Sequence, residues 1–92
     1  MAASAVAVAN RRRRAEVKKD AKAGRLSLRA IFELADGDDC VAQMRAIDLL
    51  ESLPAVGAVK AARLMREAGI AETRRIRGLG PKQRQDLLRL VG

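Results

Sequence analysis

The near absence of aromatic residues is the feature that most limits what this chain can fold into. Phe32 is the only aromatic side chain among 92 residues, although 49% of the residues are hydrophobic. A core must therefore be built from Leu, Ile, Val, Ala and Met, most of which lose little side-chain freedom in a helix. A chain of this length forms one domain, or one small domain with a tail. We predict a small all-α fold.

Basic residues gather in two blocks on either side of an acidic segment. Residues 10–29 carry nine basic and two acidic side chains, residues 30–53 carry one and six, and residues 54–92 carry nine and three. The net charge of +8 is therefore concentrated in the two basic blocks. A localised positive patch favours a polyanionic partner, and a merely solvated charged face is the less specific alternative. Neither block has a wide, bulky apolar face, which disfavours a membrane surface.

The amino-terminal basic block predicts a helix or arm that depends on the rest of the chain. Residues 11–22 are rich in helix formers but nearly lack large apolar side chains, so the segment alone would be marginally helical in water. We expect a basic arm or helix over residues 1–25, ended by Gly24. It would lean on a helical domain over residues 26–92, or become ordered on its partner.

Three features of the sequence predict a cytoplasmic protein. No apolar run reaches the length of a membrane span. The mildly apolar residues 1–10 precede the arginines, which is the reverse of a secretory signal. The lone Cys40 has no partner for an internal disulfide, which agrees with a reducing compartment, and we interpret it as a small buried hydrophobe.

The acidic middle of the chain predicts structural helices. Ser27 precedes an apolar stripe and is the expected N-cap of the first of them. The acidic turn at residues 36–39 should end that helix and cap the next. Apolar residues spaced by three from Val41 to Leu53 predict one helix with a single buried face, ending at Pro54. A calcium loop at the acidic turn lacks the twelve-residue ligand spacing and the closing Glu, so we predict no metal site.

The carboxy-terminal half contains two glycine turns flanked by basic residues. The first is centred on Gly57, whose missing side chain permits close backbone approach to another molecule. Free N–H groups at the start of the following helix favour an anion, and Lys60 and Arg63 follow within two helical turns. Gly69 is expected to end this helix. Its predicted inward face consists of Val59, Ala62, Leu64 and Met65.

The second glycine turn is richer in cations than the first. Gly78 closes a short turn, and Gly80 with Pro81 opens the last helix, because proline at the first helical position costs no hydrogen bond. Five basic side chains lie within eleven residues: Arg74, Arg75, Arg77, Lys82 and Arg84. Its predicted buried residues are Leu79, Leu87, Leu88 and Val91. We predict that both turns bind phosphates through backbone donors and nearby cations, which sets position and affinity without reading base sequence.

Both turns lie in segments with a distinctive sequence, LPAVGAVKAARLM at residues 53–65 and IAETRRIRGLGPKQRQDLL at residues 70–88. Together with the upstream residues 44–53, they resemble the actinobacterial integration host factor family, over about residues 14–92. The resemblance implies a helix-two-turns-helix fold within about residues 53–92, which also occurs in a ribosomal protein and in some DNA-repair glycosylases. It further implies a monomeric nucleoid-associated protein that binds double-stranded DNA with little sequence preference, bends or compacts it, and assists a phage integrase.

The resemblance also implies which residues contact DNA. They are Gly57, Lys60, Arg74, Arg75, Arg77, Gly78, Gly80, Lys82 and Arg84, and we add Arg63 for its place on the helix that follows Gly57. A second DNA contact is expected from the arm, at Arg11, Arg12, Arg13, Arg14 and Lys18. Ala55 and Ala58 stand where the family usually has lysines, which weakens the electrostatics of the first turn but not its backbone donors. No cofactor is expected.

The alternatives to DNA binding are enzyme activity, binding of structured RNA and recruitment of a recombinase. The chain has no histidine, no tyrosine and no second cysteine, so it is poorly supplied with the groups that common enzymes use. Structured RNA is an alternative partner, because the ribosomal relative shares the hairpin fold, but aromatic stacking residues are missing. A recombinase-recruiting module would use the exposed parts of the acidic helices between Glu33 and Glu51.

Overall fold

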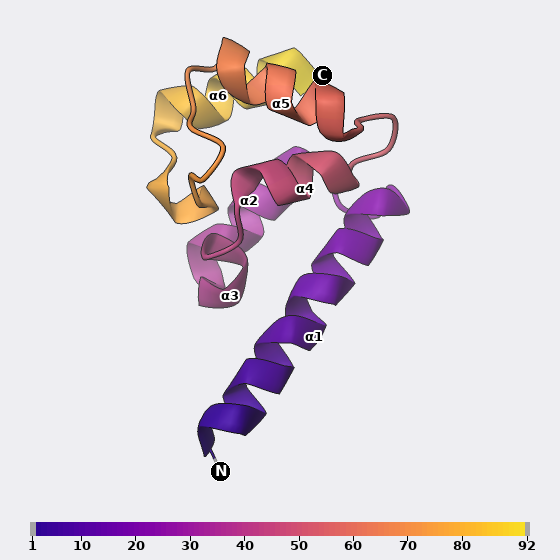
Figure 1. The fold of residues 1–92 in the computed structure, drawn as a ribbon, viewed down its shortest axis with the longest axis vertical. Coiled ribbons are helices and arrows are strands. Elements are labelled where there is room, and N and C mark those ends of the chain that lie inside the picture. The colour runs from indigo at the N-terminus through magenta and orange to yellow at the C-terminus, as the bar shows by residue number, and fades with distance from the viewer. Residues whose placement is uncertain (1, 92) are drawn as a thin grey trace.

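The computed structural model describes the backbone of residues 2–91 and the side chains of residues 10–91. The described chain contains six α-helices and one short 3-10 helix, and no strand (Figure 1). This confirms the predicted all-α fold. The elements are α1 (Ala2–Lys22), α2 (Leu28–Gly37), α3 (Asp39–Ala42), α4 (Ala46–Ser52), α5 (Ala58–Glu67), η1 (Ile76–Gly78) and α6 (Pro81–Val91).

Helix α1 is the long basic element, and its amino-terminal half projects beyond the other helices (Figure 1). Its carboxy-terminal half packs on the rest of the chain through Val17 and Ala21, both of which are fully buried. These two residues lie four apart, so they share one face of the helix and fix its rotation. The helix ends at Lys22, and Gly24 takes a left-handed φ of +79°, a conformation that glycine adopts without strain.

Both predicted N-caps are present. The Oγ of Ser27 accepts a hydrogen bond from the N–H of Ala30 at 3.1 Å, which caps α2. Asp38 ends α2 and caps α3, and its Oδ1 accepts from the N–H groups of Cys40 at 3.0 Å and Val41 at 3.4 Å. The acidic turn therefore serves both helices, as its sequence predicted.

The prediction of one continuous helix from Val41 to Leu53 is wrong. The chain leaves the helical conformation after α3 and resumes it at α4, with Arg45 extended between them. The break pairs with the residues before η1: the N–H of Ala46 donates to the carbonyl of Arg74 and the N–H of Ile76 donates to the carbonyl of Met44, both at 3.0 Å. These bonds to a distant segment replace intrahelical ones, so a tertiary contact overrides the local periodicity.

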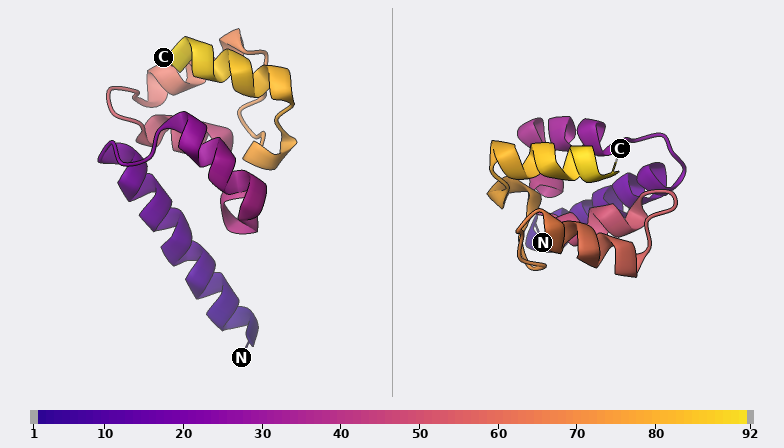
Figure 2. Two further views of the ribbon diagram at one scale, coloured as in Figure 1. Left: turned by 180° about the vertical axis from the view of Figure 1, so that it is seen from behind. Right: turned by 90° about the horizontal axis from the view of Figure 1, so that it is seen from above.

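The core is almost entirely aliphatic, and α6 lies between α2 and α5 above it (Figure 2). Phe32 is buried and contributes the single aromatic ring. The inward face predicted for α5 needs one correction, because Val59 is 86% exposed and Ala61 is buried instead. Leu88 and Val91 are only half-buried, since α6 covers the edge of the core. The largest fully buried side chains are Ile31, Leu49, Leu50, Met65, Ile76, Leu87, Val17 and Val41.

Candidate nucleic-acid interface

The first glycine turn ends in an open helix start. Gly57 occupies the N-cap of α5 in an extended conformation, and no side chain accepts from the N–H groups of the first turn. Those groups also have no acceptor within the helix, so they remain available to an anion that the helix dipole favours. A Cβ added at Gly57 would meet no other atom within 4 Å, so the space beside its backbone is open. The backbone therefore offers the donors that the sequence predicted.

The chain just before Gly57 is held in an unusual conformation. Ala55 has a left-handed φ of +62°, which residues other than glycine rarely adopt. Val56 is buried and donates its N–H to the carbonyl of Leu53 at 3.2 Å. The tight turn thus rests on the core at Val56 and leaves Gly57 outside. Of the predicted cations on α5, Arg63 is exposed and Lys60 is half-buried, and neither forms an ion pair with the described residues.

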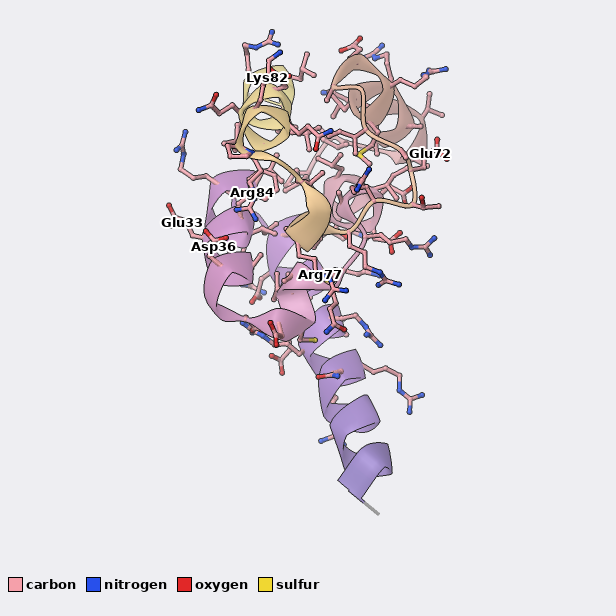
Figure 3. The ribbon with its side chains drawn as sticks, turned by 90° about the vertical axis from the view of Figure 1, so that its left-hand side faces the viewer. Glu33, Asp36, Glu72, Arg77, Lys82 and Arg84 are labelled. Atoms are coloured by element: carbon pink, nitrogen blue, oxygen red, sulfur yellow. The ribbon has the colours of Figure 1, made fainter. Side chains whose placement is uncertain are left out.

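The second glycine turn is anchored by Ile76, which is almost fully buried within η1. A side chain on Gly78 would approach the Cδ of Arg74 at 2.8 Å, so glycine is needed for the stem of that arginine to pack over the turn. Arg75 donates from its guanidinium to the carbonyl of Gln43, which ties the turn to the helix break. Arg74, Arg75 and Arg77 are all exposed, and Figure 3 shows Arg77 on the surface of η1.

Helix α6 begins at Pro81, as predicted, and one backbone donor just before it is already satisfied. The N–H of Gly80 donates to the Oε1 of Gln83 at 3.1 Å, so the side chain of Gln83 satisfies this donor. The two turns therefore differ in what they offer an anion. Both present backbone N–H groups that have no acceptor among the described residues, at Lys82 and Gln83 in the second turn, but the second turn adds more exposed cations, with Lys82 on the outer side of α6 (Figure 3).

Arg84 is partly buried and is already engaged by other side chains of the fold. Its Nη1 lies 3.0 Å from the Oδ1 of Asp36, and its guanidinium lies 5.3 Å from the centre of the Phe32 ring. The side chain is only 23% exposed, and Figure 3 shows Arg84 beside Asp36 between α6 and α2. This ion pair joins α6 to α2 through two residues that are 48 positions apart in the sequence. No local sequence pattern indicates this ion pair, because it depends on how α6 packs across α2.

Arg13 has a comparable role on α1, where its Nε lies 3.0 Å from the Oδ2 of Asp38. The hydrogen bond that Arg13 donates to Asp38 raises the pKa of Arg13 above its usual value. Burial would raise the pKa of Asp38, but the hydrogen bonds from Arg13 and from the N–H groups of Val41 and Cys40 together lower it. Arg13 thus fastens α1 to the α3 cap, whereas Arg11 and Arg12 are exposed.

Arg45 is a surface cation that the predicted contact set did not include. It lies at the helix break, is exposed, and contacts Asp48 through an Nε–Oδ2 distance of 3.5 Å. The charge pattern held a usable signal, since Arg45 is the single basic residue within the acidic segment at residues 30–53. Over the described residues there is no helix long and apolar enough to cross a membrane, and no cluster of side chains suited to a metal ion.

Known proteins share this architecture over nearly its whole length. The S13-like H2TH domain family matches residues 21–90. The integration host factor of Mycobacterium tuberculosis is 46% identical over 86 residues, which cover 94% of this chain and 82% of the relative. The integration host factor of Mycolicibacterium smegmatis is 48% identical over 82 residues, covering 89% and 78%.

A solved structure shows the same fold with a ligand. The structure of sIHF bound to an 8-base-pair palindromic DNA has a TM-score of 0.89 and 44% sequence identity, and the match covers 94% of this chain and 97% of that one. The integration host factor of Streptomyces coelicolor is likewise 44% identical, over 94% of this chain and 80% of the relative. These matches confirm the resemblance that the two glycine turns indicated. The chain belongs to the actinobacterial integration host factor family, with an S13-like H2TH domain at residues 21–90.

Proposed function

We propose that this chain is an architectural protein of the nucleoid that binds double-stranded DNA through its phosphates, with little sequence preference. The observation that carries the proposal is the pair of glycine turns. One exposes unsatisfied N–H groups at the start of α5, and the other displays Arg74, Arg75 and Arg77. Both features suit phosphate oxygens, and contacts to phosphates carry no sequence information directly. The DNA-bound structure of sIHF, a protein with the same fold, supports the assignment.

The contact set is a proposal in the same sense. Gly57, Lys60 and Arg63 would contact one stretch of backbone, and the second turn with Gly78, Gly80 and Lys82 would contact another. Arg84 can contact a phosphate only if the phosphate displaces Asp36 from its guanidinium. Bending or compaction of the duplex, a monomeric state and help to a phage integrase are further parts of the proposal that rest on family membership.

The test is a series of binding curves at several salt concentrations. Fluorescence anisotropy on two duplexes of unrelated sequence should give similar affinities and a steep loss with salt, because each neutralised phosphate adds about 0.9 to the slope of log K against log salt. Arg77→Gln should flatten the slope by about 0.9. Arg66→Gln, an exposed arginine of α5 outside the predicted contacts, is the matched control and should leave it unchanged.

Three results would contradict the proposal: strong preference for one duplex, binding that is insensitive to salt, or equal effects of the two arginine variants. Competition with a structured RNA is measured in the same assay. If RNA displaced the duplex at lower concentration than unlabelled duplex does, the RNA-binding alternative would replace the DNA-binding one.

A further inference from the structure

Three solvent-open hollows join the first glycine turn to the second across the side of α1. The first is lined by Lys18, Lys22, Asp48 and Glu51, and it ends at Gly57. The second hollow shares Lys18 and Asp48 with the first and extends to Arg14, Arg45 and Arg75. The third shares Arg75 with the second and reaches Gly78. We call this connected surface the basic groove.

Helix α1 supplies one wall of the basic groove. Arg14, Lys18 and Lys22 are spaced by four residues, so they lie along one face of the helix over an axial length of about 12 Å. The neighbouring face carries Val17 and Ala21, which are fully buried, and their burial prevents α1 from turning its cations away. Three cations of the arm are therefore fixed beside the glycine turns.

The charge of the basic groove is strongly positive. Its basic side chains are Arg14, Lys18, Lys22, Arg45, Arg74, Arg75 and Arg77, and its acidic ones are Asp48 and Glu51. One phosphate per 3.4 Å along each DNA strand matches a continuous row of cations better than it matches two isolated points. The cations of α1 and those of the second turn lie on one surface, so a single duplex can contact both.

Building on the proposed DNA-binding function, we propose that α1 and the two glycine turns form one DNA site, with Arg14, Lys18, Lys22 and Arg45 as phosphate contacts inside the basic groove. The arm is therefore part of the hairpin's own interface and not a second site for another duplex. Within the arm, the cations divide by helix face. Lys19 lies on the side away from Val17 and Ala21, lines none of these three hollows, and makes no contribution to the site.

This division allows a test in which residue types and charge are matched. Arg14→Gln with Lys18→Gln removes two cations from the basic groove, and Lys19→Gln with Arg29→Gln removes the same two residue types from exposed positions that line none of the three hollows. Glutamine keeps high helix propensity, so circular dichroism and the Tm should be nearly unchanged in both. The chain measures 43 Å in its longest direction, so a duplex of about 13 base pairs accommodates one copy.

On this short duplex the groove variant should lower the salt slope by about 1.8 and weaken binding on the order of tenfold at 0.15 M salt. The control variant should stay within about twofold of the unsubstituted chain. Equal effects of the two variants, or no effect of the groove variant, would overturn the inference. The inference would also be overturned if the groove variant lost only the ability to bridge two duplexes, because that result would place the arm in a separate DNA site. If the unsubstituted chain does not bind the duplex, DNA binding itself is refuted. If the unsubstituted chain binds and the groove variant binds equally well, only the shared site is refuted.

Discussion

Asp38 combines two stabilising roles that can be separated by substitution. Its carboxylate caps α3 through the N–H groups of Cys40 and Val41, and it also binds the guanidinium of Arg13 on α1. An N-cap is worth about 1 kcal/mol, and a partly exposed ion pair about 0.5 kcal/mol. Asp38→Ala removes both and should cost about 1.5 kcal/mol. Asp38→Asn keeps a good capping oxygen and should cost only about 0.5 kcal/mol.

The assays are urea unfolding and thermal unfolding of the full chain at pH 7, both followed by circular dichroism at the helical band. For a chain of this size, 1 kcal/mol corresponds to roughly 6 °C, so Asp38→Ala should lower the Tm by about 9 °C and Asp38→Asn by about 3 °C. A double-mutant cycle of Arg13→Gln with Asp38→Asn should return a coupling free energy of about 0.5 kcal/mol. Equal losses for Asp38→Ala and Asp38→Asn at pH 7 would refute the capping role.

The pH dependence supplies a second check on the same group. The folded state lowers the pKa of Asp38, so its charge contributes stability that is fully present above the unfolded value of about 3.9. That contribution is lost as the pH falls through the lower folded pKa. The difference between the unsubstituted chain and Asp38→Asn should therefore be constant from pH 8 to about 5 and vanish in strong acid. A difference that persists below pH 2 would contradict the ion-pair account.

Three further predictions concern the core, the first turn and the basic groove. Leu49→Ala removes a fully buried side chain of α4 and should lower the free energy of unfolding by about 3 kcal/mol, measured by urea titration. Ala55→Gly relieves the strain of the left-handed φ and should raise the free energy of unfolding by about 0.5 kcal/mol. Ala62→Gly inside α5 should lower the free energy of unfolding by about 1 kcal/mol, and a reversed order of the two variants would refute the strain at Ala55. Asp48→Asn removes a negative charge from the basic groove and should tighten DNA binding about threefold in the anisotropy assay, and weaker binding would show that Asp48 positions Arg45 instead.

Local chemistry made several elements of this fold predictable. Ser27 and Asp38 cap the helices that follow them because their short side chains reach the N–H groups of the first turn. Gly24 and Gly69 both adopt the left-handed conformation expected after a helix end. Pro81 begins α6 for an equally local reason. Each of these signals needs only a few neighbouring residues, so no knowledge of the tertiary structure was required.

The missed features all depend on contacts between distant segments. Apolar spacing from Val41 to Leu53 fits one helix, and only the pairing with residues 74–76 explains why the chain breaks it. Val59 has the right spacing for an inward face, yet the angle at which α5 crosses the core exposes it and buries Ala61. Periodicity identifies which residues share a face, but the direction of that face is fixed by the packing of neighbouring helices.

Net charge alone overstates the number of cations that a polyanion can use. Five basic side chains have carboxylate partners within residues 10–91, namely Arg13, Arg25, Arg45, Arg84 and Arg89. Only one of these, Arg45, lines the basic groove. The six other groove cations have no such partner in the described structure, so the ion pairs leave uncompensated charge along the path between the two turns. If each of these six cations neutralises one phosphate, they contribute about 5 to the salt slope, out of the value of about 17 that all 19 basic residues would give. We therefore expect the placement of the cations on the fold, and not the basic composition alone, to determine where DNA binds and how steeply salt weakens that binding.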